Sequence, residues 1–102
     1  MLWDPNKDKP VVDEIGECYL KAIKVLERKG WCQGILINPQ GEVCIAGAIQ
    51  IATYQSLKLQ QQALNLMHET LGTMISRWND APERTKGEVI AKLKDIAYAK
   101  RS

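Results

Sequence analysis

The sequence holds few of the residues from which metal sites and disulfide frameworks are built. It has one histidine, His68, and three cysteines, Cys18, Cys32 and Cys44, with no CxxC pair. A tetrahedral zinc site draws four ligands from such residues, and a disulfide framework needs paired cysteines in an oxidising compartment. We therefore expect no metal and no cofactor, and we expect the cysteines to behave as small buried hydrophobic residues.

Long apolar runs are also missing. The longest apolar stretch runs roughly from Val43 to Ala52 and is interrupted by Gly47 and Gln50. A membrane-spanning helix needs about 20 apolar residues. The N-terminus has neither the basic start nor the apolar block of a signal peptide. The sequence thus predicts a protein that does not enter a membrane and that resides in the cytoplasm.

Neither sign of charge dominates, because 14 basic and 12 acidic residues give a net charge of +2. Such a small excess does not indicate nucleic-acid binding, and the basic residues are mostly interleaved with acidic ones. The glycines match neither a Walker A loop nor a dinucleotide fingerprint. The acidic residues between 13 and 27 lie among lysines, which is typical of a solvated helix face. We expect neither nucleic acid nor nucleotide as a partner.

The composition is that of an ordinary globular domain, with 45% apolar and 25% charged residues in a chain of 102. A chain of this length has room for one hydrophobic core. Residues 1–9 are polar and contain Pro5, so we interpret them as an N-terminal arm. Residues 10–102 are expected to form a single helical domain.

Apolar residues at helical spacing predict three helices, and a run of small residues that is apolar almost all round predicts a short buried one. These helices are expected at residues 10–29, 46–54 and 58–78, and from Thr85 onward. Gly30 follows the first as a C-terminal stop. Thr85 with Glu88 three residues later forms a capping box at the start of the last helix.

Between the first and second helices the sequence predicts a short β-hairpin. Residues 35–37 and 42–45 flank residues 38–41, which have proline second and glycine fourth, as a type I turn prefers. In that register Cys44 faces Ile35 and Cys32 lies on the other face, so a Cys32–Cys44 bond would need a bend at Gly34. The predicted fold class is mainly α (α+β), a compact four-helix domain with this hairpin.

The most concentrated polar group lies between the last two predicted helices. It comprises residues 78–80 followed by Arg84 and Thr85. Loops on rigid scaffolds often carry function, so Asn79 or Asp80 could bind a ligand. Asn and Asp also cap helices and form turns, so a structural role stays open as well.

Three strings in the sequence resemble those of a family of small uncharacterised domains, a domain-of-unknown-function family met in bacterial and phage genomes. The strings are GWCQG at 30–34, GEVCIAGAI at 41–49 and WNDAPERTKGEV at 78–89. The resemblance covers roughly Ile15 to Ala97 and implies no established activity. It marks as family positions Trp31, Cys32, Gly34, Cys44, Gly47, Trp78, Asn79, Asp80 and Thr85.

Three function hypotheses follow, and the third, nucleic-acid binding, is the least favoured by the small net charge and predicts an affinity that falls steeply with salt. The first is a non-enzymatic accessory or binding protein, bacterial or phage-type, that binds a protein partner or small ligand through the hairpin and the Asn79–Asp80 loop; an inhibitor of host defence is one version. Its candidate binding residues are Trp31, Cys32, Cys44, Trp78, Asn79, Asp80 and Thr85. The alternative is a small thiol-dependent enzyme using Cys32 or Cys44 with Asn79 or Asp80. A cysteine nucleophile needs a base, and His68 is expected to be exposed, off the apolar stripe of its helix.

Overall fold

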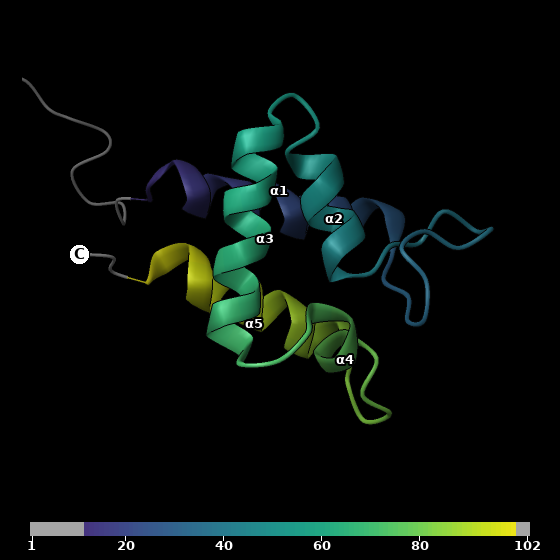
Figure 1. The fold of residues 1–102 in the computed structure, drawn as a ribbon. Helices are drawn as coiled ribbons and strands as arrows, with labels where there is room; N and C mark the ends of the chain where they lie inside the picture. The colour runs from purple at the N-terminus through teal and green to yellow at the C-terminus, as the bar shows by residue number, and fades with distance from the viewer. Residues whose placement is uncertain (1–11, 100–102) are drawn as a thin grey trace, which may run out of the picture.

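The structure is a computed structural model that describes residues 12–99, and within this range the chain is helical. Five helices follow one another: α1 (Glu14–Lys29), α2 (Ile45–Ala52), α3 (Leu57–Leu71), α4 (Ile75–Asn79) and α5 (Lys86–Tyr98). Figure 1 shows α3 crossing in front of α1 and α5, with the long α1–α2 loop projecting on the right and α4 below it. The expected arm at residues 1–9 lies outside the described residues. No helix in the described range is long and apolar enough to cross a bilayer.

The hydrophobic core lies where α1 packs against α5 and α2. Tyr19, Leu26, Ile49 and Leu93 are each 0% exposed. Burying a side chain of this kind contributes about 1.5–3 kcal/mol. The Tyr19 hydroxyl also donates a hydrogen bond of 2.6 Å to the carbonyl oxygen of Ala63, which joins α1 to α3. The apolar stripes predicted from the sequence therefore meet in one core.

Helix α1 starts later than its apolar pattern predicted. The Asp13 carboxylate accepts a hydrogen bond of 2.7 Å from the Gly16 amide and caps the helix, so Asp13 itself is extended. The expected start at Pro10 lies outside the described residues. At the other end Gly30 has a φ of 91° and donates its N–H to the Leu26 carbonyl, which confirms the predicted stop.

The predicted N-cap of the last helix, Thr85, is also confirmed, whereas the Glu88 carboxylate accepts from the Thr85 hydroxyl at 3.3 Å and not from the Thr85 backbone N–H that a capping box would use. The Thr85 hydroxyl accepts a hydrogen bond of 3.2 Å from the Glu88 amide, and α5 begins at the next residue, Lys86. The predicted apolar stripe of this helix is buried, with Val89 and Leu93 both 0% exposed.

The single long helix predicted over residues 58–78 is wrong, because the chain breaks there into α3 and α4. Gly72 adopts a left-handed φ of 70°, and its N–H donates to the His68 carbonyl and ends α3. Ile75 and Trp78 of α4 pack on the same core as α3. The apolar spacing therefore continues across a break that it does not reveal.

The predicted β-hairpin is wrong as well, since the described residues contain isolated bridges but no strand. Val43 pairs with Trp31 in a parallel bridge and with Ile37 in an antiparallel one. The Val43 amide donates to the Gly30 carbonyl, and the Val43 carbonyl accepts from the Cys32 amide, both at 3.0 Å. The backbone N–H and C=O of Val43 thus pair with the segment that follows α1. The fold class is helical rather than α+β.

The turn inside this loop lies where the sequence predicts it, but the pairing of the residues on either side of the turn differs from the predicted register. The Gly41 amide donates to the Asn38 carbonyl at 2.9 Å, and Gly41 has a φ of 85°. A turn followed by a glycine in this conformation makes a three-residue connection and shifts the pairing by one residue. Cys44 therefore donates its amide to the Leu36 carbonyl at 3.1 Å rather than facing Ile35, and it caps α2 instead of lying in a strand.

Candidate functional site

The two segments singled out by the sequence meet at the side chain of Asn79, which is 0% exposed. Its Oδ1 accepts hydrogen bonds from Trp31 Nε1 at 2.8 Å and from the Ile45 amide at 3.1 Å. Its Nδ2 donates to the Cys32 carbonyl at 3.1 Å and to Asp80 Oδ1 at 2.9 Å. A carboxamide offers two acceptor positions and two N–H donors, and all four are used.

Two further residues of the α1–α2 loop bind the end of α4. Gln33 Nε2 donates to the carbonyls of Asn79 and Ala81 at 3.0 and 2.9 Å. The Gly34 amide donates to Asp80 Oδ1 at 3.0 Å. We call Trp31, Gln33, Gly34, Asn79 and Asp80 the Asn79 cluster. The cluster fixes the loop to α4 by hydrogen bonds between residues about 46 positions apart in the chain.

Two predicted site residues outside the Asn79 cluster, Trp78 and Thr85, contribute to the start of α5. The Arg84 guanidinium lies 3.7 Å from the centroid of the Trp78 ring, an arrangement favourable for a cation–π contact. Arg84 Nε also donates to the Trp78 carbonyl at 2.9 Å, and its Nη1 forms an ion pair of 3.0 Å with Glu88. Thr85 is the N-cap of the same helix.

The cysteines are free thiols, and each of them is buried, as predicted. Cys44 Sγ accepts a weak hydrogen bond from the Gly47 amide at 3.4 Å. The single S–H of Cys32 is shared between the carbonyls of Ile35 and Glu42, which lie 3.4 and 3.3 Å from Sγ. Burial raises the pKa of the Cys32 thiol, and the neighbouring Cys44 raises it further. A raised pKa lowers the thiolate fraction at neutral pH, so Cys32 is a weak nucleophile.

The surface beside the Asn79 cluster is concave, because three hollows meet at Ser76 on α4. The most enclosed of them has a volume of about 200 Å³ and lies between the α1–α2 loop and the start of α2. We call the joined surface the α4 face. Its main lining residues are Ile35, Leu36, Ala46, Met74, Ser76 and Pro82.

Large apolar side chains are exposed on the α4 face. Ile35 is 54% exposed, Leu36 45% and Met74 58%. Cys44 and Asp80, two of the predicted site residues, also line it. The other lining residues were missed. The apolar run at 35–37 was interpreted as a strand, and Met74 as part of a helix stripe. The apolar character of these residues was therefore interpreted as a sign of burial in the core.

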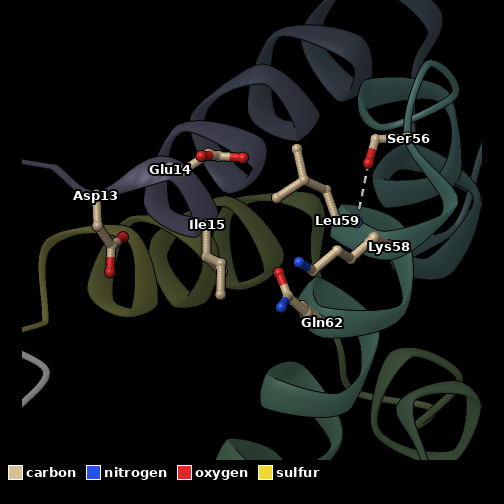
Figure 2. A pocket seen from close by; sticks show the side chains of 7 residues that line it. All are labelled: Asp13, Glu14, Ile15, Ser56, Lys58, Leu59 and Gln62. Atoms are coloured by element: carbon tan, nitrogen blue, oxygen red, sulfur yellow. Dashed lines mark hydrogen bonds between the residues drawn. The ribbon is translucent and has the colours of Figure 1, made fainter.

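A separate hollow, of about 410 Å³, lies between the first turns of α1 and α3 (Figure 2). Two of its polar residues cap those helices. Asp13 accepts from the Gly16 amide, and the Ser56 hydroxyl accepts from the Leu59 amide at 3.2 Å. Within residues 12–99 no group of three His, Cys, Asp or Glu side chains is close enough to hold a metal ion. The α4 face is therefore the stronger candidate for a functional surface.

Comparison with known proteins gives one match. No curated protein and no solved structure matches the chain. A family model described as a family of unknown function (DUF6197) matches residues 11–99. This match confirms that the resemblance is to an uncharacterised family, while the bacterial or phage origin stays a prediction. The chain belongs to the DUF6197 family, a family of unknown function.

Proposed function

We propose that this protein is a non-enzymatic binding module that docks a partner protein on the α4 face. The observation that carries the proposal is the meeting of three hollows at Ser76. Exposed apolar side chains around a concave surface are typical of protein interaction sites. The apolar residues Ile35, Leu36 and Met74 form the centre of the proposed interface.

The smallest hollow is suited to a single anchoring side chain of the partner. Its volume of about 200 Å³ is that of one large aliphatic or aromatic group, and its walls include Ile35, Leu36 and Ala46. Interfaces derive much of their binding energy from a few anchors that fill such pockets. Arg77 and Asp80 at the edge of the face provide the charged rim that usually surrounds an apolar centre.

The Asn79 cluster supports this function by holding the loop in place before a partner arrives. A loop that is ordered in advance loses less conformational entropy on binding. The hydrogen bonds from Gln33 and Gly34 hold the α1–α2 loop against the end of α4. They therefore keep the most enclosed hollow, which the loop lines, next to the hollow at the end of α4. We interpret the buried family positions Cys32 and Asn79 and the partly buried Trp31 as supports of the binding surface.

The thiol-enzyme alternative has less support. The Cys32 thiol has a raised pKa. The one histidine, His68, is exposed on α3 and lines the α4 face beside Asn65. We do not extend the proposal to inhibition of host defence, since no contact indicates that class of partner.

The test uses random peptides displayed on phage and selected on the folded protein. The affinity of a selected peptide is then measured by fluorescence anisotropy for two variants. Ser76→Trp places a large ring where the hollows join, and Ser76 is exposed, so the fold tolerates the change. We expect it to weaken peptide binding at least about tenfold, the effect of losing one anchor.

Gln55→Trp is the matched control, because Gln55 is a neutral, exposed residue in the turn between α2 and α3. It should leave the affinity unchanged. Selected peptides that bind Ser76→Trp as tightly as the unmodified protein would contradict the proposal, and so would a selection that yields no binder.

A further inference from the structure

We propose that Cys32 and Cys44 form a redox pair that closes to a disulfide in the presence of a hydroperoxide and thereby regulates the α4 face. The regulatory part rests on the proposed function, whereas bond formation does not. The inference comes from the way the structure departs from the expected hairpin.

The parallel bridge between Trp31 and Val43 brings the two cysteines together. Val43 bonds to the residues on either side of Trp31, with both hydrogen bonds at 3.0 Å. In a parallel pairing the residues that follow the paired ones are neighbours on the same face. Those residues are Cys32 and Cys44. An antiparallel hairpin would have separated them.

The bend that such a bond requires is present at Gly34. Its φ of 82° belongs to the region that glycine favours, and its amide is held by Asp80. After this bend the chain returns across both cysteines. Cys32 Sγ donates to the Ile35 carbonyl at 3.4 Å, and the Cys44 amide donates to the next carbonyl, that of Leu36, at 3.1 Å. Both cysteines thus contact adjacent peptide groups.

Oxidant can reach the pair through the α4 face. Cys44 lines the hollow of about 200 Å³ and retains 8% exposure. Cys18 lies on α1, lines none of the hollows described above, and its Sγ donates to the Glu14 carbonyl. Cys18 is therefore an internal control for nonspecific oxidation.

The chemistry needs one hydroperoxide for each disulfide. Cys44 sulfur attacks a peroxide oxygen, the O–O bond breaks, and the products are a sulfenic acid and water when hydrogen peroxide is the oxidant. Cys32 sulfur then attacks the Cys44 sulfur, the S–S bond forms and the S–O bond breaks, releasing a second water. The two thiols lose two electrons and two protons in total, and one hydrogen peroxide becomes two waters.

Bond formation alters the binding surface through Ile35. A disulfide sulfur carries no proton, so the carbonyls of Ile35 and Glu42 lose the donor that Cys32 provides. Ile35 and Cys44 both form walls of the most enclosed hollow. Oxidation should therefore change the shape of the pocket that receives the anchoring side chain of the partner.

The first experiment treats the folded protein with hydrogen peroxide and measures masses without reduction. Trypsin leaves both cysteines in one peptide, residues 30–58, which should become about 2 Da lighter because two hydrogens are lost. Cleavage after Glu42 should then give two fragments that separate only after reduction. Cys18→Ala should behave identically, and Cys44→Ser, which keeps a favoured N-cap residue, should form no such link.

The proposal is overturned if the folded protein keeps three free thiols, or links Cys18, under conditions in which the protein unfolded in urea forms the 32–44 bond.

The second experiment measures the affinity of the phage-selected peptide before and after oxidation. We expect binding about tenfold weaker after oxidation, with recovery in dithiothreitol. The affinity of Cys44→Ser, whatever its value before treatment, should not change on oxidation. A disulfide that leaves peptide affinity unchanged overturns the regulatory role alone. The absence of any peptide that binds the α4 face rejects the proposed function and with it the regulatory role, and the mass measurement still decides the bond.

Discussion

The core of α1, α2 and α5 and the junction of the α1–α2 loop with α4 are held by different forces. In the core, fully buried side chains such as Leu26, Val89 and Leu93 pack against one another. At the junction, the buried Asn79 makes four hydrogen bonds to groups on the loop, on α2 and on Asp80. Apolar burial is non-directional, whereas hydrogen bonds fix position and angle.

The contrast predicts two ways in which the molecule can fail. Loss of apolar burial should lower the stability of the whole domain, because the helices share one core. Loss of the Asn79 hydrogen bonds should release the loop and α4 before the rest, because weakly packed segments open in local steps. The predictions below test this difference, beginning with the largest effect.

Leu93→Ala should lower the free energy of unfolding by about 3 kcal/mol, because it removes apolar contacts and leaves a cavity. Urea denaturation followed by circular dichroism measures the change. Leu57→Ala is the control, because Leu57 is 79% exposed and should cost less than about 0.5 kcal/mol. Equal effects of the two substitutions would contradict the position of the core.

Asn79→Ala should lower the free energy of unfolding by about 2–3 kcal/mol, because the buried Ile45 amide and Trp31 indole lose their acceptor. Hydrogen exchange should speed up at Gly34 and Ile45 more than in α5. Asn65→Ala, which removes an exposed bond to Gln61, should have little effect. Uniform loss of protection across all helices would show that the junction is not a separate unit.

Gly47→Ala should destabilise the protein by about 1–2 kcal/mol through overpacking. A Cβ at this position would lie 2.5 Å from the Leu36 carbonyl oxygen, so the loop must move away from α2. At Gly87 the nearest atom to such a Cβ is Thr85 Oγ1 at 3.9 Å, and the same substitution should stabilise α5 by about 0.5–1 kcal/mol. Denaturation midpoints of the two variants should therefore shift in opposite directions.

The smallest effect should appear at alkaline pH. Burial raises the pKa of Cys18 and of Cys32 above the ordinary thiol value of 9.0. The unfolded chain then loses these protons at lower pH than the folded one, so stability is full below about pH 8 and falls as pH rises through 9. Urea midpoints between pH 7 and pH 10 measure this fall, and Cys18→Ala should reduce it.

Much of the fold could be predicted from the sequence because its causes are local. The spacing of apolar residues located the core helices, and Gly30 and Thr85 marked two of their ends. The break at Gly72 was missed, since apolar residues on both sides of it face the same core. The hairpin was wrongly predicted because an apolar run around a turn is compatible with more than one pairing.

The candidate site also contains residues that the sequence indicated and residues that it did not. Trp31, Cys32 and Asn79 were marked by a family resemblance, and the hydrogen bonds show that they meet in the folded chain. Ile35, Leu36 and Met74 were assigned to a strand and a helix stripe, because a sequence shows that a residue is apolar but not whether anything covers it. The concave surface around Ser76 had no signal in the sequence.

The sequence by itself determined the core helices α1 and α5, their ends at Gly30 and Thr85 and the apolar faces they bury, because these depend on neighbours within one or two turns. The tertiary structure alone decided which edge of Val43 is paired, and hence that Cys32 lies beside Cys44. It also decided which apolar side chains remain exposed. Both outcomes depend on contacts between residues far apart in the chain, and these form only when the whole domain packs.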